Sequence, residues 1–170
     1  AGGIFPTTAT MLFQYGLTSA DNFRPAGYDI GDVDGDGCAD VLIGAFLAGP
    51  GGVSGEGETY VVFGKESDFH ASVLLSSLED SDGVILEGGE AGDNSGFSVS
   101  TAGDVNGDGY ADMLIGAYGA DPDGVSPAGV TYVGLGKSES FGTRVDLGAL
   151  GGTDGFVLEG LCLLYTSDAG

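Results

Sequence analysis

One stretch of the chain is repeated, without a gap, 72 residues further along. When residues 31–88 are aligned with residues 103–160, 32 of the 58 positions are identical. Self-similarity at one fixed period is the signature of repeat architectures, in which each unit buries its apolar surface by stacking on a neighbour. The repeat therefore restricts the fold to one that is built from equivalent, stacked units.

Each unit contains four strand-like segments joined by glycine-rich turns. They span 28–33, 40–45, 59–63 and 83–87 in the first unit and 97–102, 112–117, 130–135 and 155–159 in the second. Residues 41–43 and 113–115 are continuous apolar runs, which suit strands that are buried on both faces. No long segment keeps an apolar stripe at helical spacing. The pattern predicts an all-β fold, a partial β-propeller with about two four-stranded blades.

The repeat also sets the expected organisation of the chain. Blades are predicted at 21–88 and 89–160, and residues 1–20 are interpreted as the remnant of a preceding blade. Residues 161–170 abandon the repeat and resemble the translation of a sequencing adapter, so they are interpreted as a non-native tail, with a genuine final strand as the alternative. Because propellers close with about 4–8 blades, the chain is expected to be one section of a longer protein.

An acidic, glycine-studded loop precedes the second strand of each unit. Oxygen-bearing side chains stand at loop positions 1, 3, 5 and 9, and a glycine suited to a sharp turn stands at position 6. Calcium takes about six to eight oxygen ligands, which a short loop supplies from alternate positions. The loops therefore predict two Ca²⁺ sites. Their ligands would be Asp32, Asp34, Asp36, the Cys38 carbonyl and Asp40, and then Asp104, Asn106, Asp108, the Tyr110 carbonyl and Asp112.

Acidic loops of this kind also have structures other than a calcium site. Two unit charges about 5 Å apart repel by roughly 3 kcal/mol at an effective dielectric constant of about 20, so the clustered carboxylates need a counter-charge or raised pKa values. Simple hairpin turns with solvated carboxylates remain the alternative. An EF-hand requires an oxygen ligand at position 12, where this chain has Ile43 and Ile115.

The motifs resemble the FG-GAP repeats of the integrin α-subunit β-propeller, especially those of bacterial secreted proteins. The resemblance rests on Gly-Phe-Ser at 96–98, on the loop at 103–109 and on Leu-Ile-Gly-Ala at 114–117, with counterparts at 31–37 and 42–45. It implies a seven-bladed propeller used for extracellular recognition, with Ca²⁺ in a hairpin of the blade. The first unit lacks the Gly-Phe-Ser signature, and Phe46 and Tyr118 replace the proline of the Gly-Ala-Pro motif. Asn106 in place of an aspartate predicts a weaker second site.

Charge and missing motifs exclude several functions. The chain has 26 acidic and four basic residues, and a net charge of −22 repels nucleic acid and anionic lipid. No apolar stretch is long enough for membrane insertion. His70 is the only histidine, and no Gly-x-Ser-x-Gly elbow accompanies it. Gly136-Lys137-Ser138 lacks the upstream glycine of a phosphate loop, since that position is Thr131. We therefore expect a non-enzymatic chain.

These observations predict a calcium-binding propeller segment of a secreted or cell-surface protein. It would act in adhesion or recognition, its partners being an unidentified extracellular protein or glycan and the neighbouring blades of the same longer chain. One alternative is a propeller module of a secreted hydrolase whose catalytic residues lie outside this segment. Another is a purely structural acidic spacer.

Overall fold

A computed structural model describes residues 30–49, 55–67, 69, 72–124 and 128–160, together with the backbone of 23–24. The predictions for residues 1–20 and 161–170 and for His70 lie outside the described residues. The described part contains strands and three short 3₁₀ turns, at Leu75–Ser77, Pro122–Gly124 and Leu147–Ala149. No helix in this part is long and apolar enough to cross a membrane.

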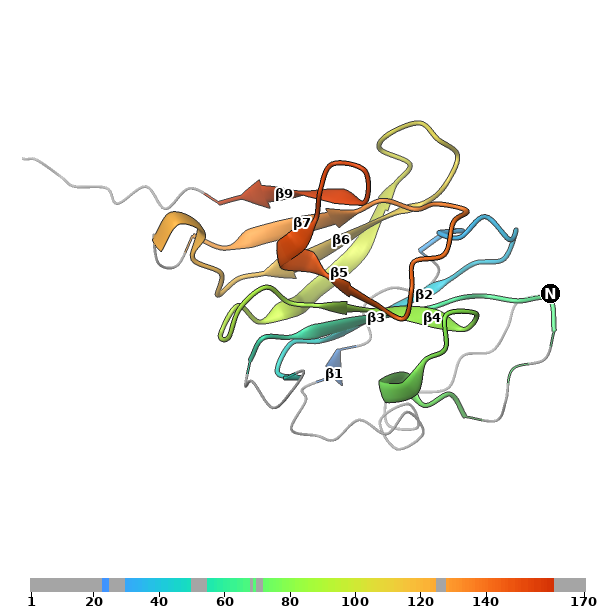
Figure 1. Cartoon of the computed structure of the whole chain (residues 1–170), viewed down its shortest axis with the longest axis horizontal. Coiled ribbons are helices and arrows are strands. Elements are labelled where there is room, and N and C mark those ends of the chain that lie inside the picture. The colour runs from blue at the N-terminus through green and yellow to red at the C-terminus, as the bar shows by residue number, and fades with distance from the viewer. Residues whose placement is uncertain are drawn as a thin grey trace, which may run out of the picture.

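The strands form two sheets, which Figure 1 shows beside one another. The first has the order β1 (Phe23–Arg24), β2 (Val41–Ala45), β3 (Glu58–Val62), β4 (Gly83–Glu87) and β8 (Arg144–Asp146). The second has the order β5 (Ser95–Gly103), β6 (Asp112–Ala117), β7 (Val130–Gly134) and β9 (Gly155–Glu159). All pairs are antiparallel except β4 with β8. The prediction of an all-β fold made of propeller-like, four-stranded blades is confirmed.

The repeat is visible in the strand registers. Ile43 pairs with Tyr60 in the first sheet, and Ile115 pairs with Tyr132 in the second, 72 residues later. The bounds predicted for β4, β6 and β9 agree with the structure. Those for β2 and β7 differ by one residue at one end, and those for β3 and β5 differ by one or two residues at both ends. Equivalent sequence therefore gives equivalent pairing over most of each unit.

Two strands differ from the prediction. Residues 30–33, expected to complete the first strand of unit one, lie outside any strand; residues 28–29 are outside the described part. The first strand is instead β1, in which Phe23 pairs with Ala45 as Ser95 pairs with Ala117. The three-residue strand β8 was not predicted at all.

An apolar cluster fills the space between the two sheets. The first sheet contributes Leu42, Val61, Val84 and Leu86, and the second contributes Val99, Met113, Ile115 and Tyr132. The opposite face of the first sheet carries a second cluster, in which Ile43, Tyr60 and Ile85 pack on Leu75 and Leu78. Adjacent residues of β2 point to opposite faces of the sheet, so both faces of this blade are buried.

Candidate metal centre

The first acidic loop folds its own side chains back onto its backbone. The carboxylate of Asp32 accepts hydrogen bonds from the backbone N–H groups of Gly35 at 2.6 Å and Gly37 at 2.9 Å. Asp34 accepts from the N–H of Asp36 at 3.1 Å, and Asp36 accepts from the N–H of Cys38 at 2.7 Å. Gly35 and Gly37 have φ values of 82° and 87°, a region in which other residues are strained.

The second loop repeats these hydrogen bonds. Asp104 accepts from the N–H groups of Gly107 at 2.7 Å and Gly109 at 3.0 Å. Asn106 accepts from the N–H of Asp108 at 3.0 Å, and Asp108 accepts from the N–H of Tyr110 at 3.0 Å. The shared spacing of aspartate and glycine therefore produces one loop shape twice.

The last aspartate of each loop is fully buried and ties the loop to the segment that follows the third strand of its unit. Asp40 accepts from the N–H of Val33 at 2.7 Å and, across 24 residues, from the N–H of Gly64 at 2.7 Å. The pKa of Asp40 is raised to about 6, chiefly by burial and further by repulsion from Asp34 and Asp32, although the two hydrogen bonds act to lower it.

Asp112 has the same arrangement, with donors in equivalent positions. Its carboxylate accepts from the N–H of Val105 at 2.7 Å and from the N–H of Gly136 at 2.8 Å. Neither Asp40 nor Asp112 is solvent-exposed. Both are therefore carboxylates that the fold holds in a fixed orientation at the base of a loop.

Carboxylate oxygens of Asp32, Asp34 and Asp40 all lie within 4.8 Å of one another. Burial raises the pKa of Asp34, and its neighbours Asp36 and Asp32 add repulsion. None of the ion pairs within the described residues involves a loop carboxylate. These pairs join Lys65 to Asp82, Lys137 to Asp154, and Arg144 to Glu58 and Glu87. A hard, oxygen-seeking cation fits this donor set, since it would supply the missing positive charge.

Not all the predicted ligands are brought together. The carboxylate of Asp36 is outside the group of three, and the carbonyl oxygens of Cys38 and Tyr110 remain predicted ligands. Within the described ranges, the second loop contains no comparably close group of acidic side chains. There, the side-chain amide of Asn106 donates to Asp108 at 2.8 Å. Asn106 in place of an aspartate thus removes one negative charge from the loop and adds a hydrogen-bond donor to Asp108.

The two loops contact each other at the same end of the molecule (Figure 1). The N–H of Ala111 donates to the carbonyl of Asp32 at 2.9 Å, and the N–H of Lys137 donates to the carbonyl of Val33 at 2.9 Å. A Cβ on Gly35 would lie 2.4 Å from the ring of Tyr110, so this ring rests directly on the first loop.

Sequence reasoning missed Gly64 and Gly136, whose N–H groups hold the buried aspartates. A Cβ on Gly64 would lie 2.5 Å from the carbonyl oxygen of Ala39, and one on Gly136 would lie 2.4 Å from that of Ala111. The available signal was the Gly-Lys pair that recurs at the same place in both units. The lysines that follow, Lys65 and Lys137, form the ion pairs described above.

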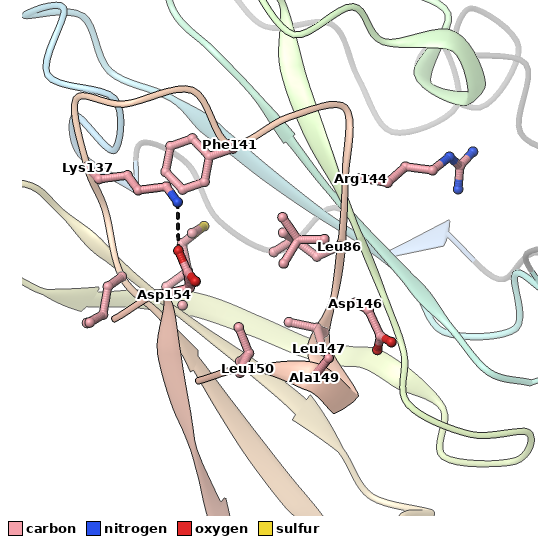
Figure 2. A pocket seen from close by; sticks show the side chains of 13 residues that line it. Leu86, Lys137, Phe141, Arg144, Asp146, Leu147, Ala149, Leu150 and Asp154 are labelled. Carbon is pink, nitrogen blue, oxygen red and sulfur yellow. Dashed lines mark hydrogen bonds and ion pairs between the residues drawn. The ribbon is translucent and has the colours of Figure 1, made fainter. Parts of the chain in front are cut away.

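A recess of about 280 Å³ lies beside β8, where the two units meet (Figure 2). Its walls are largely apolar, with Leu86, Phe141, Leu147 and Leu150 among them. Of its ionisable residues, Lys137 and Asp154 bind each other at 2.7 Å, and Arg144 pairs with Glu58 and Glu87. The carboxylate of Asp146 accepts from the N–H of Gly148 at 2.8 Å. These residues do not form a nucleophile–base pair.

Comparison with known proteins agrees with this architecture. The FG-GAP repeat model matches residues 95–134, which contain the second acidic loop. Residues 95–134 therefore have the sequence pattern of an FG-GAP repeat. The chain is 32% identical to human integrin alpha-IIb over 116 residues, 66% of this chain and 10% of the integrin.

Two further relatives extend the comparison. Drosophila melanogaster integrin alpha-PS2 is 34% identical over 106 residues, which are 60% of this chain and 7% of that protein. Mouse integrin alpha-IIb is 32% identical over 117 residues, 67% of this chain and 10% of the relative. The chain is therefore similar to a short section of these integrin α subunits and spans about a tenth or less of their length.

Proposed function

We propose that this FG-GAP segment is a calcium-binding propeller module, with Ca²⁺ held in the loops at 32–40 and 104–112. The observation that carries the proposal is the group of three carboxylates, Asp32, Asp34 and Asp40, which has no cationic partner among the described residues. The second loop repeats the backbone hydrogen bonds of the first, which supports a second site. The proposed blades are residues 21–88 and 89–160.

The ligand set follows the loop positions. The first site would use Asp32, Asp34, Asp36, the Cys38 carbonyl and Asp40, and the second would use Asp104, Asn106, Asp108, the Tyr110 carbonyl and Asp112. Bound Ca²⁺ would supply positive charge and oxygen coordination. The chain orients the carboxylates beforehand, since their hydrogen bonds to backbone N–H groups fix Asp32 and Asp104 in the turns.

The two sites are expected to differ in affinity. The first loop has four carboxylates and the second has three, because Asn106 replaces Asp34 at position 3. Affinity in calcium loops rises with ligand charge and with rigidity of the site. The first site is therefore the tighter one.

The module's role is proposed from the integrin relatives and from its surface charge. We propose that it belongs to a secreted or cell-surface protein and takes part in adhesion, binding an extracellular protein or glycan. Extracellular calcium modules bind at about 10⁻⁴–10⁻³ M, which suits millimolar extracellular calcium. We also propose that the segment is not itself catalytic; in the alternative of a secreted hydrolase, the catalytic residues would lie outside this segment.

Calcium titration by calorimetry tests the proposal. The full chain should bind two Ca²⁺ ions, and the Asp104→Ala, Asp108→Ala double variant should bind one. Glu66→Ala with Glu139→Ala is the matched control, because it removes two exposed negative charges outside the loops. Two ions bound by both double variants would refute the ligand assignment, and no Ca²⁺-specific heat with the unmodified chain would refute calcium binding.

A further inference from the structure

The recess beside β8 coincides with one departure from the repeat. Gly134 of β7 lies in its wall, and the residue 72 positions earlier is Val62. The Val62 side chain packs on the apolar cluster of the first unit that contains Leu75, whose counterpart Leu147 lines the recess. The second unit therefore has only a hydrogen atom at a position that the first unit fills with an isopropyl group.

The backbone at Gly134 does not itself require glycine. The residue lies in a regular strand and has no positive φ. A Cβ there would lie 3.1 Å from the Cε atom of Met113, which is the flexible end of that side chain, and 3.9 Å from its Cβ. Valine, the residue of the first unit, can therefore be placed here with a small movement of Met113.

The walls of the recess come from both units, and all of the lining residues lie within the described part of the chain. The first unit provides Leu86, which is buried between the sheets. The second unit provides the thioether of Met113, the ring of Phe141 and the side chains of Leu147 and Leu150. These groups offer carbon and sulfur surface, against which apolar molecules pack favourably.

Phe141 is a wall that is held from two sides. Its ring centroid lies 5.8 Å from that of Phe63 in the first unit, and the Nζ atom of Lys137 lies 5.1 Å from the Phe141 centroid. An aromatic ring packs well against another ring and also against a methionine sulfur. With Phe141 and Met113 both in its walls, the recess favours an aromatic occupant over an aliphatic one.

The charged groups around the recess already have partners. Lys137 binds Asp154 at 2.7 Å, and Arg144 pairs with two glutamates of the first unit. Figure 2 shows the Arg144 guanidinium directed away from Leu86. The carboxylate of Asp146 accepts a backbone N–H at 2.8 Å. A charged molecule would lose its hydration here without gaining an unpaired counter-charge, so the recess favours an uncharged one.

We propose that this recess is a binding site for a small, uncharged aromatic molecule. Its volume is about 280 Å³, and an apolar cavity of about 150 Å³ is large enough to bind benzene. The recess therefore has room for one or two rings. The site is separate from the acidic loops and does not depend on metal binding, because none of the proposed metal ligands lines it.

Saturation-transfer NMR with toluene, on the full chain, tests the proposal. Toluene should bind saturably. Benzoate and benzylamine carry a similar ring with a negative or a positive charge, and each should bind roughly tenfold or more weakly than toluene. Absence of saturable toluene binding would overturn the proposal, and this outcome includes the case in which another segment of the longer protein already fills the recess. Equal binding of either charged analogue would overturn the assignment to an uncharged ligand.

Gly134→Val places the site, because its side chain would occupy the space that the ligand needs. It should weaken toluene binding by roughly tenfold or more. Gly151→Val is the matched control, since a Cβ on Gly151 meets nothing within 4 Å and this residue does not line the recess. Thermal unfolding checks that both variants are folded. Unchanged binding by a folded Gly134→Val protein would place toluene elsewhere and overturn the proposal; the charged analogues test the unmodified chain if this variant does not fold.

Discussion

Leu86 and Leu158 occupy the same position of the repeat, and their truncation should have very different costs. Leu86 is 2% exposed between the sheets, and Leu158 is 52% exposed on a face of β9 that the other described residues leave partly uncovered. Leucine to alanine removes three carbon atoms, worth about 0.8 kcal/mol each when fully buried. A cavity adds to this, so Leu86→Ala should destabilise the fold by about 3 kcal/mol.

The same calculation gives a smaller value for Leu158→Ala. About half of that side chain is already in water, so its truncation should cost about 1 kcal/mol, with little cavity formed. Equilibrium urea unfolding in constant Ca²⁺ measures both variants, and the thermal midpoint should fall by roughly 6–12 °C for Leu86→Ala. Equal destabilisation by the two variants would refute the difference in burial between these two leucines.

Three further outcomes are expected. With chelator present, the free energy of unfolding should rise as pH falls from about 6 towards 4, because the raised pKa of Asp40 makes the folded state bind a proton more tightly than the unfolded state. The increase in melting temperature that Ca²⁺ causes should shrink over the same pH range. An increase that does not depend on pH would contradict this role of Asp40. Asn106→Asp should raise the affinity of the second site, measured by calorimetry, because it adds a ligand charge; unchanged or weaker binding would count against that ligand position. Gly64→Ala should destabilise the fold by about 1–3 kcal/mol, since its Cβ would lie 2.5 Å from the Ala39 carbonyl oxygen, while Gly151→Ala, whose Cβ meets nothing within 4 Å, should be near neutral in thermal unfolding.

The strands of the repeat could be predicted because their signals are local. β6 is a continuous apolar run followed by glycine and alanine, and its bounds match the prediction. β8 could not be predicted, since Arg144–Asp146 has no strand pattern and pairs only because β4 of the other unit presents a free edge. β1 differed because Phe23–Arg24 lacks the Gly-Phe-Ser motif on which its second-unit counterpart is recognised.

The loops show the same division between local and distant determinants. The spacing of Asp32, Asp34 and Asp36 predicts the turn, whose hydrogen bonds stay within a few residues. The role of Gly64 in holding Asp40 depends on a contact across 24 residues, and spacing within the loop carries no information about it. The exposure of Leu158 likewise depends on what covers its face, which its own sequence does not specify.

The contacts between the loops imply that the two proposed metal sites influence each other. Asp32 provides a proposed side-chain ligand of the first site, and its carbonyl accepts the N–H of Ala111, which follows the proposed ligand Tyr110 of the second. The Tyr110 ring rests on Gly35 between these sites. An ion that orders one loop reduces the conformational entropy that the other loses on binding, which favours positive coupling. Repulsion between two bound cations opposes it but is weakened by salt and by the surrounding carboxylates. The start of β5 contacts the first unit through the N–H of Ser95, which donates to the carbonyl of Glu56, and its end leads into the second loop. Ordering of that loop therefore also restrains the interface between the units.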